Sequence, residues 1–175
     1  MLKNKTILNK DKHMTFTHFI FKKRIIPMII AIELLALTLL ILSFMIKGDI
    51  MIKLTIFFFM ITYPIGMILS QKLTDKKIIK SFLGLDEGIK IDYEFRDDDF
   101  DVFSKSNNID SHSKAEYRML LKVQEDKENI YLFVNTTNAL IIDKNSFTEG
   151  TLDDFRKILS NKIDKKGKII KKITI

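Results

Sequence analysis

Two apolar stretches decide the fold of this 175-residue chain: IIPMIIAIELLALTLLILSFMI at residues 25–46 and IMIKLTIFFFMITYPIGMIL at residues 50–69. The first contains one ionisable side chain, Glu33, and the second contains one, Lys53. Because about 20 apolar helical residues cross a hydrocarbon core of about 30 Å, each stretch is long enough to span a membrane. Both are apolar on every face, which disfavours a helical hairpin buried inside a soluble protein. We therefore predict two transmembrane helices, 25–46 and 50–69, joined by a tight turn.

The distribution of charge predicts the orientation of this hairpin. The whole chain has 29 Lys and Arg against 22 Asp and Glu, a net charge of +7. Residues 1–80 hold thirteen of the basic and four of the acidic groups, which is +9, and the remainder is −2. Cations cluster before the first stretch and after the second, at Lys22, Lys23, Arg24, Lys72, Lys76, Lys77 and Lys80. By the positive-inside rule, both termini are expected in the cytoplasm of a multi-pass inner-membrane protein.

The carboxyl group of Glu33 is out of place in an apolar helix. A charged group near the middle of a bilayer costs a few kcal/mol unless it is protonated, paired or turned toward protein. Folding the hairpin about Gly48 sets Glu33 level with Thr62 and Tyr63, so we expect a polar contact there. A proton or ion relay and a contact between copies are the alternatives. Gly66 and Ser70, four positions apart, offer a small-residue face for close helix packing.

The second half of the chain has the composition and the alternating pattern of a water-exposed β domain. Residues 1–24 are expected to be a cytoplasmic juxtamembrane segment, with a short strand at 6–8 and a helix for which Asp11 is the N-cap. Residues 70–88 are expected to be a linker leaving the membrane. Apolar and polar residues then alternate over 89–96, and further strands are predicted at 100–105, 111–117, 119–124, 130–135 and 139–143. Short strands at this spacing predict an antiparallel meander or small barrel.

A helix is predicted to close this domain at its C-terminal end. Thr151 and Asp154 resemble a capping box, and apolar residues follow at helical spacing from Leu152 to Ile163. About six strands followed by one amphipathic helix outline a pleckstrin-homology-like domain over residues 89–163. The α+β fold class is thus a transmembrane hairpin followed by this domain. The basic tail, 164–175, is either solvated or held against the inner leaflet.

These features occur in an order that resembles a known family. The segments are IDYEFRDDDFDVFSKSN at 91–107, AEYRMLLKVQED at 115–126, IYLFVNTTNALIIDKNSF at 130–147 and LDDFRKIL at 152–159. After two membrane spans, this order resembles the YcxB-like family of small bacterial membrane proteins. The chain departs from it at Tyr117, where many members have Trp, and at Asp143, where many have Pro. The resemblance implies a membrane-tethered, pleckstrin-homology-like domain of largely unknown role.

Residue types that carry catalysis are sparse. The chain has no cysteine and three histidines, His13, His18 and His112, without metal-binding spacing, so we expect no metal or cofactor. Serine-hydrolase and nucleotide-binding motifs are absent from the sequence, so we expect no catalytic residue and no enzyme. The acidic turn at Asp97, Asp98 and Asp99 repels phosphates, which disfavours binding to lipid headgroups or nucleic acid.

The sequence therefore favours a membrane-anchored, non-enzymatic adaptor. Its partners are expected to be the lipid bilayer and an unidentified protein, contacted through the strand at 111–117. Assembly with further copies of the chain is left open. The alternative is a membrane stress or immunity accessory that acts through its transmembrane helices, at Glu33 and Gly66. An enzyme or transporter is the third and least favoured hypothesis.

Overall fold

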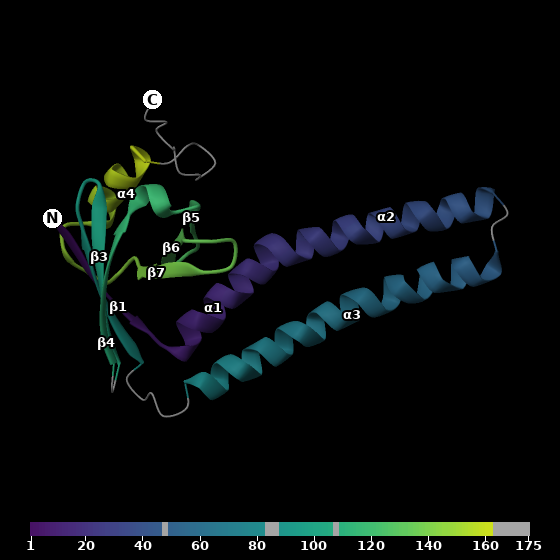
Figure 1. Cartoon of the computed structure of the whole chain (residues 1–175), viewed down its shortest axis with the longest axis horizontal. Helices are drawn as coiled ribbons and strands as arrows, with labels where there is room; N and C mark the ends of the chain where they lie inside the picture. The colour runs from purple at the N-terminus through teal and green to yellow at the C-terminus, as the bar shows by residue number, and fades with distance from the viewer. Residues whose placement is uncertain (47–48, 83–87, 107–108, 163–175) are drawn as a thin grey trace. The chain divides into compact units, whose positions relative to one another are not determined.

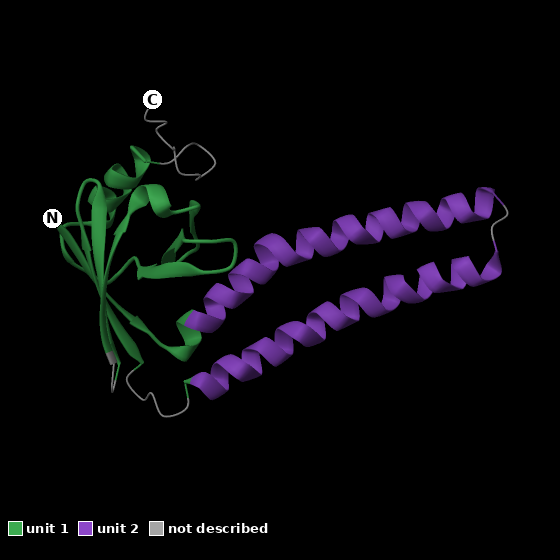
Figure 2. Cartoon of the chain, viewed as in Figure 1, with its two compact units in different colours: residues 1–12, 82–175 green, residues 13–81 purple. Residues whose placement is uncertain are grey.

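The computed structural model of the chain describes residues 1–46, 49–82, 88–106 and 109–162 (Figure 1). The chain forms two compact units: unit 1 comprises residues 1–12 and 82–175, and unit 2 comprises residues 13–81 (Figure 2). The N-terminal segment that the sequence suggested as one juxtamembrane piece, 1–24, is thus divided between the units. The basic tail at 164–175 lies outside the described residues.

Unit 2 consists almost entirely of helix. Three elements, α1 (Lys10–Ile20), the single π-turn η1 (Phe21–Ile25) and α2 (Ile26–Met45), run without interruption, and α3 (Ile50–Ser81) follows. Both continuous helices, Lys10–Met45 and Ile50–Ser81, are long and apolar enough to cross a membrane. Residues 70–81 of the predicted exit segment are the end of α3.

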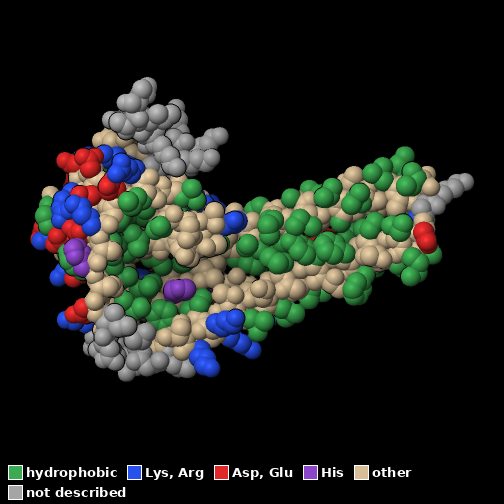
Figure 3. Space-filling view, viewed as in Figure 1, with side chains coloured by type: hydrophobic (Ala, Val, Ile, Leu, Met, Phe, Trp, Pro, Cys, Tyr) green, Lys and Arg blue, Asp and Glu red, His purple; other side chains and the backbone are tan. Residues whose placement is uncertain are grey.

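The apolar side chains of these helices are mostly exposed rather than buried. Figure 3 shows hydrophobic side chains covering the visible face of α2 and α3. In the most apolar window of each helix, 6% and 0% of the residues are buried, which is opposite to the pattern of a soluble core helix. An exposed apolar surface of this extent favours association with a membrane.

The N-cap of α1 differs from the prediction. The side chain of Asn9, not Asp11, accepts the backbone N–H of Lys12 at 2.9 Å. Asp11 instead lies in the first turn, where its negative charge is favourable at the positive end of the helix. Asparagine and aspartate are nearly equivalent caps, so composition alone could not separate Asn9 from Asp11.

The described residues of unit 1 form eight strands in two antiparallel sheets. They are β1 (Leu2–Leu8), β2 (Ile89–Phe95), β3 (Asp99–Ser106), β4 (Ile109–Glu116), β5 (Lys122–Glu125), β6 (Asn129–Phe133), β7 (Ala139–Asp143) and β8 (Phe147–Glu149). The larger sheet has the order β4-β3-β2-β1-β8, and the smaller has β5-β6-β7. The predicted antiparallel strands are confirmed, but within the described residues the sheets do not close into a barrel.

Strand β1 is the unexpected member of the larger sheet. It pairs along its whole length with β2, from Leu2 opposite Phe95 to Leu8 opposite Ile89, and its other edge pairs with β8. Because Leu8 and Ile89 are direct partners, β1 and β2 form a β-hairpin. The entire helical unit is inserted where the turn of that hairpin would be.

The core of unit 1 lies among both sheets and the C-terminal helix α4 (Leu152–Ser160). Phe155 of α4 is fully buried, and its ring lies 4.4 Å from that of Phe95. The capping box predicted at Thr151 is confirmed: Thr151 Oγ1 accepts the N–H of Asp154, whose carboxylate accepts the N–H of Thr151 at 3.1 Å. The helix start is thereby fixed and its apolar face is turned into the core.

A glycine just before this cap supplies the first stability prediction. Gly150 has φ +75°, and a Cβ there would lie 2.0 Å from Cδ2 of buried Leu2. Gly150→Ala is expected to destabilise unit 1 by about 1–3 kcal/mol through left-handed strain and crowding. Gly66→Ala is the control, because no described atom lies within 4 Å of that Cβ position. Thermal unfolding in mild detergent checks both, and equal stability losses would contradict this assignment.

Candidate functional site

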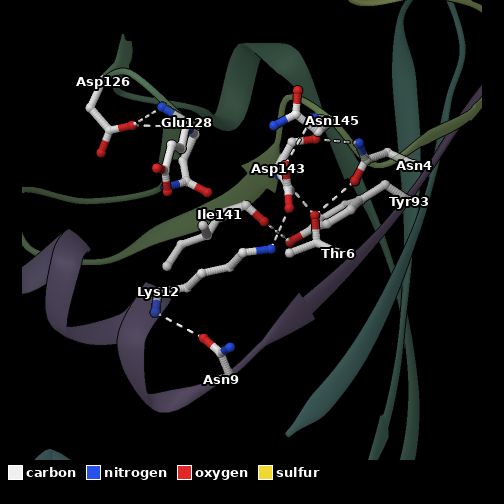
Figure 4. Close-up of polar contacts among 11 residues, drawn as sticks. Asn4, Thr6, Asn9, Lys12, Tyr93, Asp126, Glu128, Ile141, Asp143 and Asn145 are labelled. Atoms are coloured by element: carbon white, nitrogen blue, oxygen red, sulfur yellow. Dashed lines mark hydrogen bonds and ion pairs between the residues drawn. The ribbon is translucent and has the colours of Figure 1, made fainter.

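A cluster of polar side chains ties β1 to the beginning of α1 and to the end of β7 (Figure 4). Asn4 and Thr6, both fully buried on β1, are joined by a 2.7 Å hydrogen bond from the Thr6 hydroxyl to Asn4 Oδ1. Asn4 Nδ2 donates to the carbonyl of Asp143 at 2.8 Å, and the N–H of Asp143 donates to Thr6 Oγ1 at 2.9 Å. Two polar residues thus satisfy the buried backbone at the end of β7.

The Asp143 carboxylate anchors the first turn of α1. Its Oδ2 binds the Lys12 ammonium, and its Oδ1 accepts the N–H of Asn145 at 2.8 Å. Desolvation by itself would raise the pKa of Asp143, but the hydrogen bonds from Lys12 and Asn145 outweigh it and lower that pKa. Nearby, burial raises the pKa of Tyr93, so its phenol stays protonated and donates to the Ile141 carbonyl at 3.1 Å.

This arrangement predicts a pH-dependent contribution to stability. Because the pKa of Asp143 is lower in the folded state, its contribution is present above the unfolded value, 3.8, and is lost as the pH falls through the folded value. Asp143→Asn should cost about 1–3 kcal/mol at pH 7 by leaving Lys12 without its carboxylate.

The difference between the wild-type chain and this variant should shrink as the pH falls below 3.8, and it should disappear once the pH is below the lowered, folded-state pKa of Asp143. Urea unfolding of the wild-type and Asp143→Asn chains across this pH range measures it. A difference that stays constant with pH would show that the charge of Asp143 does not stabilise the fold.

A second polar cluster lies on the outer face of β3 and β4. The carboxylate of Asp101, 6% exposed, binds the Arg96 guanidinium and accepts a hydrogen bond from His112 Nε2 at 3.1 Å. Asp99 pairs with Arg96 at 2.9 Å and with Lys114 at 2.7 Å. The hydrogen bond from His112 contributes most to lowering the pKa of Asp101, and that from Lys114 does so for Asp99.

These contacts change the interpretation of the acidic turn. The sequence analysis treated Asp97, Asp98 and Asp99 as an acidic turn that repels phosphates. In the structure, Asp99 of that turn and the neighbouring Asp101 are instead paired with cations beside β2 and on β4. Asp98 binds the Lys162 ammonium at 2.6 Å. The imidazole of His112 stacks on Phe103, with ring centroids 4.3 Å apart and planes 4° apart. The cluster stiffens the β3–β4 hairpin, and its groups bind one another instead of converging on a common point.

Strand β4 is the exposed margin of this face. Among the described strands it ends the five-stranded sheet, with β3 on one side only. Its residues 110–114 are exposed on both faces of the sheet. The sequence suggested the strand at 111–117 as a contact surface. Its first four residues are therefore accessible, whereas Tyr117 belongs to the 3-10 turn η2 (Tyr117–Met119) and is buried.

The polar residues predicted inside the helical hairpin form fewer contacts than expected. Glu33 is partly enclosed, and its Oε1 has no hydrogen-bond partner among the residues described. Thr62 donates its hydroxyl to the Phe58 carbonyl at 3.0 Å, one helical turn back. The ring of Tyr63 stacks on that of Phe59 at 5.2 Å.

The small residues predicted for helix packing lie on the open side of α3. Gly66 and Ser70 are exposed, and no described atom lies within 4 Å of a Cβ built on Gly66. Gly66 therefore takes no part in closing the hairpin on itself. Lys53 instead reaches across to α2, with its ammonium 4.5 Å from the centre of the Phe44 ring.

Sequence reasoning missed Asn4, Thr6 and Lys12. Their partner, Asp143, is between 131 and 139 positions away in the chain. On β1 the buried positions are Leu2, Asn4 and Thr6, so the period of two was present but was carried by polar side chains. Within the described residues, no group of three or more His, Asp or Glu side chains is arranged to hold a metal ion.

Fold and site together define a class of protein: a two-sheet α+β unit with an apolar helical hairpin inserted between its first two strands. Comparison with protein families shows that residues 97–159 match the model described as YcxB-like protein, which confirms the resemblance seen in the sequence. The match runs from the turn before β3 through all but the last residue of α4, and it leaves β1, α1, α2, α3 and β2 outside. No curated protein and no solved structure matches the chain.

Proposed function

We propose that this chain is a non-enzymatic adaptor anchored in a bacterial inner membrane. In this proposal α2 and α3 cross the bilayer as a hairpin, and unit 1 is a cytoplasmic, pleckstrin-homology-like domain that offers the edge of β4 to another protein. The two antiparallel sheets followed by α4 support the domain assignment. The exposed, regular edge of β4 supports docking by strand addition.

One observation carries the topology. Strand β1 precedes the helices and pairs with β2, which follows them, so both ends of the hairpin must lie on one side of any membrane. An even number of crossings is the simplest path that satisfies this pairing. The cations of Lys22, Lys23 and Arg24, and those near the end of α3, support the proposal that this side is the cytoplasm.

The adaptor role rests on how polar groups are used. In both clusters the carboxylates are bonded to cations or backbone groups of the same chain, an arrangement that stabilises a surface more readily than it activates a substrate. Enzymes instead leave such groups poised at a substrate. We therefore propose that this fold serves to present the edge strand β4 as a rigid docking surface tethered to the membrane.

A photo-crosslinking amino acid at Ser113 tests docking in living cells. The same amino acid at exposed Lys127, in the turn between β5 and β6, is the matched control. We expect a discrete adduct from position 113 and none from position 127. No adduct at 113 above the control would overturn docking through β4.

The second candidate function acts through the helices. It is favoured by the enclosed Oε1 of Glu33, which has no hydrogen-bond partner in the described part of the chain, and by the exposed Gly66 and Ser70. Glu33→Gln keeps the size of the side chain but removes its acidity. An unchanged adduct at position 113 in the Glu33→Gln chain supports the adaptor, whereas loss of that adduct from correctly folded protein supports the helix-based function.

A further inference from the structure

Strand β4 is unusually open for a sheet edge. Its eight residues pair with β3 in one continuous register, from Asp99 opposite Glu116 to Ser106 opposite Ile109. At the other end of the same sheet, β8 has only three residues and pairs with a register shift. A long, regular edge presents a row of backbone donors and acceptors that favours pairing with a further strand.

Two of the devices that normally protect such an edge, proline and a β-bulge, are missing from β4. Its sequence has no proline, and its described register has no bulge. The one lysine of the strand, Lys114, is held by Asp99 of its own chain at 2.7 Å. Edge lysines, prolines and bulges are the usual means of preventing unwanted pairing, so an open β4 indicates an edge that is meant to be covered.

The geometry of antiparallel pairing restricts how β4 could meet a second β4. Only alternate residues direct their N–H and C=O groups away from β3. Two identical strands related by a twofold axis must therefore centre on a residue, not between two residues. Within the strand this leaves four central registers, with the axis passing at Ser111, His112, Ser113 or Lys114.

The charges of β4 select one of these four registers. With the axis at His112, Asp110 of each copy lies opposite Lys114 of the other. Lys114, which also binds Asp99 of its own chain, thereby gains a second carboxylate, and the pairing gives two attractive pairs. With the axis at Ser113, Asp110 lies opposite Glu116 twice, and at Lys114 the lysine lies opposite itself. The axis at Ser111 overlaps only the five residues 109–113 and offers Asp110 a histidine in place of the lysine.

We propose that β4 pairs antiparallel with β4 of a second copy of this chain, centred on His112. The pairing would join two five-stranded sheets into one continuous sheet. Confinement of both copies to one membrane would favour it by raising their effective concentration. The inference rests on the proposed docking role of β4 and identifies the strand that docks there.

The cysteine-free sequence allows a direct test in the full-length, membrane-bound chain. His112→Cys is expected to form an intermolecular disulfide under mild oxidation, because residue 112 lies opposite itself. Ser113→Cys is the matched control: its partner in this register is Ser111, so its own copies are diagonal and should not crosslink. Crosslinking at 113 in place of 112, or at neither position, would overturn the proposal.

A charge exchange tests the register independently. Asp110→Lys and Lys114→Asp each replace two attractive pairs by two repulsive ones, so each variant alone should self-associate about tenfold more weakly. When the two variants are expressed together with different tags, the introduced lysine faces the introduced aspartate. The native Lys114 of the first variant likewise faces the native Asp110 of the second, so both attractive pairs return. If self-association is weakened in each variant alone and restored in the mixture, a folding defect cannot be the cause. If the mixture does not restore association, this register is contradicted.

Failure of this inference is distinguishable from failure of the docking role. A photo-adduct at position 113 with a different protein, without a disulfide in the His112→Cys chain, would reject self-pairing and keep the adaptor. If neither the photo-adduct nor the disulfide forms, both self-pairing and the docking role of β4 are rejected. A photo-adduct of twice the chain mass together with the disulfide is the outcome expected here.

Discussion

A shortened chain, in which Leu8 is joined directly to Ile89 by an Asn-Gly turn, is expected to fold as a water-soluble domain. The shortening removes residues 9–88 and closes the β1–β2 hairpin where Leu8 and Ile89 are already partners. Asn-Gly is a favoured two-residue hairpin turn. The buried residues Leu2, Asn4 and Thr6 keep their places, while the Lys12 contact with Asp143 is lost.

The matched control for this experiment is a chain that starts at Ile89. Without β1, both β2 and β8 lose their partner along one edge, and seven paired residues disappear from the interior of the sheet. We expect this chain to show no cooperative unfolding, whereas the shortened chain with β1 should unfold in one transition. Circular dichroism and amide dispersion in NMR spectra distinguish them. Equal folding of both chains would contradict the role of β1.

The second large effect is expected at Phe155. This side chain is fully buried, and its ring lies 4.4 Å from Phe95 and 5.7 Å from Phe147. Phe155→Ala should destabilise unit 1 by about 3–5 kcal/mol, because it removes buried apolar surface and leaves a cavity between α4 and the larger sheet. That is a large part of the stability of an ordinary domain.

Phe103→Ala is the control for the same chemical change at a surface site. Phe103 is 37% exposed and contacts the His112 ring, so its loss should cost about 1 kcal/mol. Tyrosine fluorescence during urea unfolding in mild detergent provides the readout, since three of the four tyrosines, Tyr93, Tyr117 and Tyr131, belong to unit 1. Similar losses for both variants would show that α4 is not packed as described.

The sequence predicted those parts of the fold whose pattern is local. The apolar helices follow from hydropathy alone, and the sequence of four residues showed the capping box of α4. Strand β7 was predicted with its observed limits, and β2 was predicted one residue too long, through Arg96. The short strand β8 was not predicted, because three residues at the edge of a sheet are too few to show an alternating pattern. The separation into two sheets depends on how strands associate, which no local pattern reveals.

The placement of β1 was beyond local patterns for two reasons. Two of its three buried side chains, Asn4 and Thr6, are polar, so hydropathy hid the alternation. Its pairing partner β2 lies beyond the whole helical unit in the sequence, so no short-range signal joins the two strands. By contrast, Glu33 was easy to identify because it is the one carboxyl group in an apolar run. Its hydrogen bonding could not be inferred from its position along the helix alone.

Accessibility of single cysteines tests the central claim most directly: an apolar hairpin crosses the membrane between two strands of one cytoplasmic domain. The three variants are Lys5→Cys on β1, Asp49→Cys before α3 and Ser111→Cys on β4, all at exposed positions of a cysteine-free chain. With a membrane-impermeant maleimide on intact spheroplasts, only the cysteine at position 49 should react, while those at positions 5 and 111 should react after permeabilisation. Labelling of positions 5 and 111 from opposite sides, or of all three positions from outside, would contradict the account.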